Sequence, residues 1–105
     1  MPMPLIVTPL AIAMKKLEEE RLQAIVQQAR AIDNRDERIE WLECQRASIR
    51  DPDSLATVIV MSFDKSDRAF AIHRLVPKEQ GEEMAGVVGR LSTKLPPPEV
   101  WLGTK

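Results

Sequence analysis

The segment from Ala56 to Val76 places the strongest constraint on how this chain can fold, because two apolar runs flank a short polar break. The first run, A-T-V-I-V-M-S-F, is rich in β-branched residues, and the second, R-A-F-A-I-H-R-L-V, is partly so. The break D-K-S-D has a length that commonly joins antiparallel strands. The pattern therefore predicts a β-hairpin over 56–76, with its loop at Asp64–Asp67.

Neither face of this expected hairpin is properly polar. If Phe63 lies opposite Arg68, the bulky side chains share one face and suit a core: Ile59, Met61, Phe63, Phe70 and Ile72. The other face holds small and mostly apolar side chains: Val58, Val60, Ser62, Ala69, Ala71, His73 and Leu75. A two-stranded ribbon is not stable alone, so each face needs a cover. We expect the small face of the hairpin, or its edge, to meet a second copy of the chain and form a four-stranded or larger sheet, most simply in a two-fold dimer.

Composition is that of an ordinary globular domain. The chain has 105 residues, of which 30% are charged and 44% hydrophobic, and its net charge is −1. We expect one domain over 1–105, without the basic footprint of a nucleic-acid-binding domain. The single cysteine, Cys44, excludes an intrachain disulfide and favours a reducing compartment. The apolar N-terminus has no basic region ahead of it, so we expect no signal peptide, no membrane span and a cytoplasmic protein.

Helix signals precede the expected hairpin. Pro2 and Pro4 favour an extended arm over 1–7, and Thr8-Pro9 begins a long helix that should run to about Ile32. Asn34, followed by Glu37, resembles a helix cap and predicts a second helix over 35–49. One continuous helix over 9–50 is the alternative, and Pro52 ends the helix in either case.

A further helix should follow the hairpin. Pro77 begins it, and apolar residues recur at helical spacing: Met84, Val87, Val88, Leu91 and Leu95. Gly81, Ala85 and Gly89 recur every four residues beside this stripe, which suggests close packing against another element. Three prolines then stop the helix and begin a tail over 96–105 that carries Trp101. The expected fold is therefore α+β: a long N-terminal helix or helical hairpin, an antiparallel β-hairpin and a C-terminal amphipathic helix.

Residues able to perform chemistry are scattered. His73 is the only histidine, and Cys44 lies on a different expected element. The glycines of the last helix lack the spacing of a phosphate-binding loop, and the run from Asp64 to Asp67 lacks the length of a calcium loop. We therefore expect no catalytic residue, no cofactor and no metal, and a protein that is not an enzyme.

The surplus of apolar surface predicts an interaction protein. We expect a homodimeric regulator, adaptor or inhibitor that binds another macromolecule, most simply a protein. The candidate contact residues are Val58, Val60, Ala69, Ala71, His73, Arg74 and Trp101. The first alternative is nucleic-acid binding through the hairpin cations Lys65, Arg68 and Arg74 and the arginines of the second helix. The second alternative is a small-molecule site at the subunit boundary, near His73 and Arg74.

Overall fold

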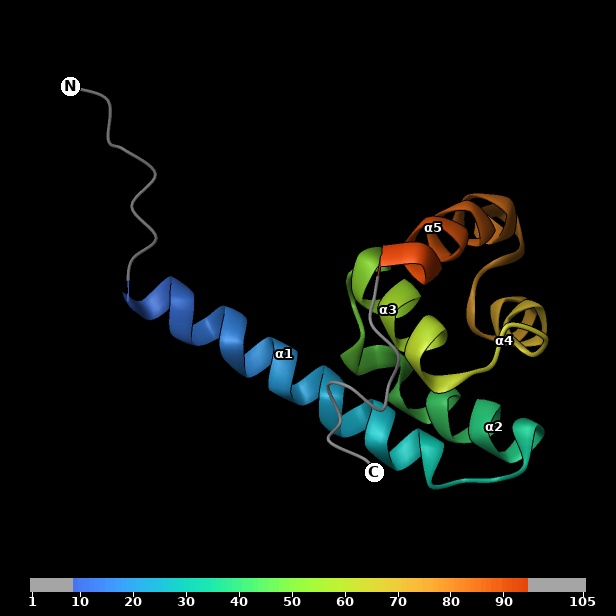
Figure 1. The fold of residues 1–105 in the computed structure, drawn as a ribbon, viewed down its shortest axis with the longest axis horizontal. Helices are drawn as coiled ribbons and strands as arrows, with labels where there is room; N and C mark the ends of the chain where they lie inside the picture. Colours follow the sequence, from blue (N-terminus) through green and yellow to red (C-terminus); the bar gives the residue numbers. More distant parts are fainter. Residues whose placement is uncertain (1–8, 95–105) are drawn as a thin grey trace.

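The computed structural model describes the backbone of residues 9–94 and the side chains of residues 17–94. This part of the chain is entirely helical (Figure 1). The elements in chain order are α1 (Pro9–Arg30), α2 (Arg35–Gln45), η1 (Arg46–Ser48), α3 (Pro52–Ser62), α4 (Arg68–Leu75), η2 (Lys78–Gln80) and α5 (Gly81–Lys94). No strand occurs between residues 9 and 94, so the α+β prediction was wrong.

The expected hairpin is a pair of helices. Its first arm lies in α3 and its second in α4, while the polar break at Asp64–Asp67 falls in the loop between them, as predicted. Local chemistry explains why α3 begins where it does. Asp51 is the N-cap residue, and its side chain accepts a 3.1 Å hydrogen bond from the backbone N–H of Ser54. Pro52, which was expected to end a helix, occupies the first turn of one instead.

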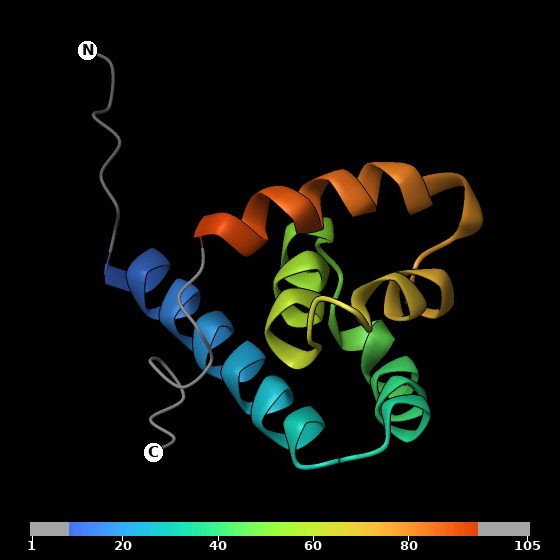
Figure 2. The same ribbon diagram turned by 45° about the vertical axis from the view of Figure 1, so that its right-hand side comes forward.

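Helix α3 is the centre of the molecule. It contacts α1, α4 and α5, which surround it (Figure 2). Every residue from Val58 to Phe63 is buried, so the second half of this helix has no polar face. A helix that is apolar all round belongs inside a protein, and its sequence lacks the amphipathic period that identifies surface helices. The α3 side chains of the predicted dimer face, Val58, Val60 and Ser62, are thus covered by other helices of the same chain.

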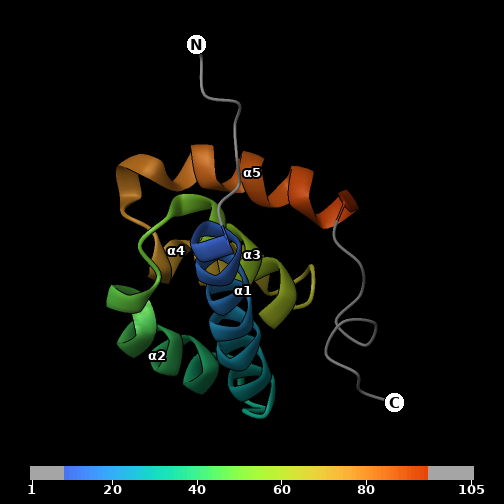
Figure 3. The ribbon, with the colours of Figure 1, turned by 90° about the vertical axis from the view of Figure 1, so that its left-hand side faces the viewer.

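The two N-terminal helices are separate. Residues 31–34 form a non-helical connection between α1 and α2. Asn34 caps α2, because its side chain accepts a 3.0 Å hydrogen bond from the backbone N–H of Glu37. The predicted cap is confirmed, and the single long helix is excluded. The second half of α1 enters the core through Ile25, Val26 and Ala29, while the backbone of its first half extends away from the other helices (Figure 1). Figure 3 looks along α1 from its N-terminal end.

Helix α5 is amphipathic, as predicted: Met84 and Val88 are buried, and Val87 and Leu91 pack against the core. The expected close packing at its glycines was wrong. A Cβ atom built on Gly81 or Gly89 would meet no atom of another element within 4 Å. The predicted arm at 1–7 and the tail at 96–105 lie outside the described residues. No helix of the described part is long and apolar enough to cross a membrane.

Candidate interaction surface on helix α4

The structure divides the predicted contact residues into a buried set and an exposed set. Val58 and Ala71 are 0% exposed and Val60 is 5% exposed, so all three belong to the core of a single copy. The hairpin face to which they were assigned does not exist. Ala69, His73 and Arg74 are exposed, and all three lie on α4. Trp101 lies outside the described residues.

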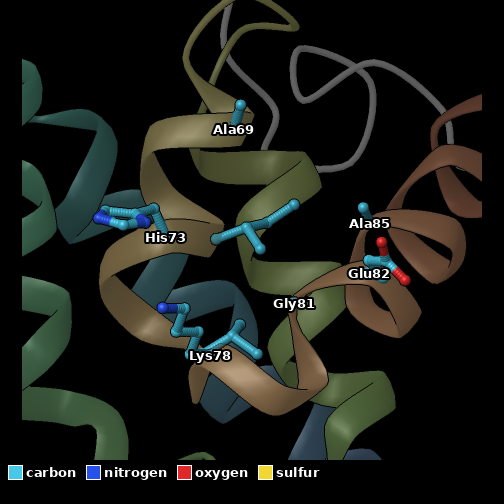
Figure 4. Close-up of a pocket in the computed structure, with 8 residues that line it drawn as sticks. Ala69, His73, Lys78, Gly81, Glu82 and Ala85 are labelled. Atoms are coloured by element: carbon cyan, nitrogen blue, oxygen red, sulfur yellow. The ribbon is translucent and has the colours of Figure 1, made fainter.

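A groove of about 390 Å³ runs between α4 and α5. Its lining is mostly apolar and comes from both helices and the connection between them: Ala69, Ile72, His73, Val76, Lys78, Gly81, Glu82 and Ala85. Figure 4 shows Ala69 on α4 and Ala85 on α5 at one end, with Lys78 and Gly81 at the other end, where the helices are joined. Gly81, which has no side chain, and Ala85, which has only a methyl group, leave the α5 wall open to close approach.

Charged and polar groups stand at the edges of this groove. The imidazole ring of His73 lies at the outer edge of α4, on the side away from α5 (Figure 4). Glu82 contributes a carboxylate to the α5 wall, and Lys78 contributes an ammonium group where the helices join. An apolar floor with a few charges at its rim is the usual composition of a binding surface.

An exposed aromatic residue lies on the side of α4 that is nearer to α2. Phe70 is 51% exposed, and the guanidinium carbon of Arg35 on α2 lies 4.0 Å from the centre of its ring. This stacking is a cation–π contact, which holds the ring in place on the surface. Leu17 on α1, at 64%, is the other large apolar side chain exposed in the described part of the chain. The predicted hairpin register assigned Phe70 to the core, so sequence reasoning missed it as a surface residue.

The arginines hold the fold together. Five of them donate hydrogen bonds to backbone carbonyl oxygens: Arg21 to Ser48, Arg30 to Met61, Arg38 to Ile32 and Ser62, Arg46 to Ile49 and Leu75, and Arg68 to Val60 and Phe63. Two others form ion pairs, Arg35 with Asp36 and Asp67, and Arg74 with Glu43. Most cations named for nucleic-acid binding are therefore engaged within the protein.

Three of these arginines meet at the C-terminal end of α3. The last carbonyls of a helix have no partner within the helix, and the helix dipole makes this end negative. Arg30, Arg38 and Arg68 supply the missing donors, and we call these three residues the arginine clamp. Burial lowers the pKa of Arg38 and the charge of Arg30 lowers it further, while nearby Asp64, Asp67 and Asp33 oppose the shift.

The described residues hold no cluster of His, Cys, Asp and Glu side chains that could bind a metal ion. Cys44 on α2 and His73 on α4 are both exposed, and no hydrogen bond joins their side chains within the described residues. The surface of α4 is therefore the feature that best fits a function. Comparisons of the chain with protein-family models, with curated proteins and with solved structures gave no match.

Proposed function

We propose that this chain is a non-enzymatic protein-interaction module that binds its partner through α4. The observation that carries the proposal is the combination, on one short helix, of an apolar groove on one side and an exposed, Arg-stacked Phe70 on the other. Aromatic side chains and arginines dominate the binding energy of many protein interfaces.

A protein partner suits this surface better than a nucleic acid does. The groove between α4 and α5 is mostly apolar, whereas phosphate binding requires several free cations along one face. Arg38, Arg46 and Arg68 donate to backbone carbonyls, and removing them for phosphate contacts would leave helix ends unpaired. The guanidinium group of Arg74 forms an ion pair with the carboxylate of Glu43, with an N–O distance of 2.7 Å, so it is not a free cation either.

Site-specific photo-crosslinking in the cells that express the protein tests this function. A photoreactive phenylalanine analogue at Ala69 should give a discrete adduct that a protease destroys and a nuclease does not. The matched control places the analogue at Gln27, an exposed position on α1 outside the proposed surface. Adducts at neither position, or equal adducts at both, would contradict binding through α4.

A further inference from the structure

We infer that the partner seated on α4 is a second copy of this chain, with Phe70 of each copy in the α4–α5 groove of the other. The inference rests on the proposed function and names the occupant of its surface. It does not use Val58, Val60 or Ala71, which were among the side chains that first suggested a dimer, since those are buried within one copy. It uses two complementary features that the chain carries side by side.

The positions of these features on α4 suit a two-fold arrangement. Successive residues of an α-helix are about 100° apart, so Phe70 lies roughly a quarter-turn from Ala69. Ala69, Ile72 and Val76 border the groove, and His73 stands between the groove and Phe70. A two-fold axis parallel to α4 exchanges the two sides of the helix. It therefore brings the Phe70 side of one copy onto the groove side of the other, and does the same in return.

The dimensions of the groove agree with this occupant. Phe70 and Ala69 are adjacent in the first turn of α4, at the end of the groove where Ala69 and Ala85 lie (Figure 4). An incoming ring would meet small side chains there rather than bulky ones. The groove holds about 390 Å³, which is more than enough for one aromatic side chain.

Charge complementarity supports the same arrangement. The ring of Phe70 carries the guanidinium group of Arg35 with it, stacked at 4.0 Å. The wall that receives the ring belongs to α5, where Glu82 lines the groove and its carboxylate forms no hydrogen bond or ion pair within the described part of the chain. Each copy thus presents beside its aromatic residue a cation, which Asp36 and Asp67 of the same copy partly neutralise, and beside its groove a carboxylate. Because the interface is isologous, this pairing would occur twice.

Sedimentation equilibrium over a range of concentrations tests the dimer. The wild-type chain should approach twice the 11.9 kDa mass of one copy. Phe70→Ala should raise the dissociation constant about thirtyfold or more, as expected for a central aromatic residue. Leu17→Ala is the matched control, because it also removes an exposed apolar side chain but lies on α1, and it should leave the dissociation constant unchanged.

A charge exchange tests the register of the two copies. Glu82→Arg should weaken association about tenfold, and adding Arg35→Glu should restore it, because the opposite charges are then exchanged across the interface. Both positions lie on the surface, and circular dichroism verifies that each variant remains helical. Equal weakening in the single and double variants would contradict the pairing of these residues.

Disulfide trapping tests the position of the two-fold axis relative to α4. In a Cys44→Ser background, His73→Cys should form an interchain disulfide on oxidation, since the two copies of residue 73 would meet near the axis; Gln27→Cys should not. A wild-type chain that stays monomeric at every concentration, or a dimer that Phe70→Ala leaves intact, would overturn the inference. The proposed function would survive either result if the probe at Ala69, and not the probe at Gln27, captured a different protein.

Discussion

The guanidinium group of Arg38, in the first turn of α2, donates a hydrogen bond to the backbone carbonyl oxygen of Ser62, the last residue of α3. The same side chain also donates to the carbonyl oxygen of Ile32, through bonds of 2.9 and 2.7 Å. It therefore connects the end of the central helix to the turn between α1 and α2. The guanidinium carbon of Arg38 also lies 5.5 Å from the centre of the Phe63 ring, a cation–π contact that adds to this connection.

Replacing Arg38 by methionine should lower the free energy of unfolding by about 2–3 kcal/mol, because charged hydrogen bonds to buried carbonyls are lost and those carbonyls stay desolvated. Urea denaturation measures the change. Arg50→Met is the control, since the exposed Arg50 forms no hydrogen bond or ion pair within the described residues. Equal effects of the two substitutions would show that the arginine clamp contributes nothing specific.

Asp51→Ala should destabilise the protein by about 1 kcal/mol, the usual cost of removing an N-cap side chain. The carboxylate accepts the backbone N–H of Ser54 and holds the first turn of α3. Asp53→Ala removes a nearby exposed carboxylate that caps nothing, and it should cost no more than a few tenths of a kcal/mol from the helix dipole. Thermal unfolding of both variants makes the comparison. A cost confined to Asp53→Ala would mean that α3 begins elsewhere.

Val60→Lys should prevent cooperative folding, because it places an unpaired charge in a side-chain position that is only 5% exposed. We expect a loss of about 4 kcal/mol or more. In the hairpin first predicted, this residue lay on an interface, and the substitution would have produced a folded monomer instead. Circular dichroism with a melting curve separates the two outcomes.

Gly89→Ala should stabilise the protein by about 1 kcal/mol, since glycine inside a helix is less favourable than alanine by about that amount. The new methyl group would meet nothing within 4 Å. The midpoint of thermal unfolding should therefore rise. A fall would indicate that another surface packs tightly against this side of α5.

Local signals in the sequence located most of the helix boundaries. Asn34 with Glu37 identified the start of α2, and the polar residues from Asp64 to Asp67 identified the turn after α3. Caps and turns are set by hydrogen bonds within a few residues, so a reader of the sequence can see both partners. The same reasoning should have identified the start of α3, because Asp51-Pro52 repeats the pattern of Thr8-Pro9 that was interpreted as a helix start.

The candidate surface was only partly visible. Ala69, His73 and Arg74 were named, but as members of a strand face that included the buried Val58 and Ala71. Phe70 was assigned to the core because residues two apart share a face in a strand. On a helix, Phe70 and Ile72 point in nearly opposite directions, so one faces solvent on the α2 side and the other borders the groove.

The sequence by itself determined where the chain turns and that residues 56–76 contain two apolar elements, because these properties depend on near neighbours and composition. Only the tertiary structure decided that the elements are helices. The β-branched run from Thr57 to Val60 favours a strand locally, yet burial against α1, α4 and α5 outweighs a propensity difference of about 1 kcal/mol or less per residue. The second half of α3 is buried on every side and keeps no polar face, and so its sequence carries no period by which a helix could be recognised.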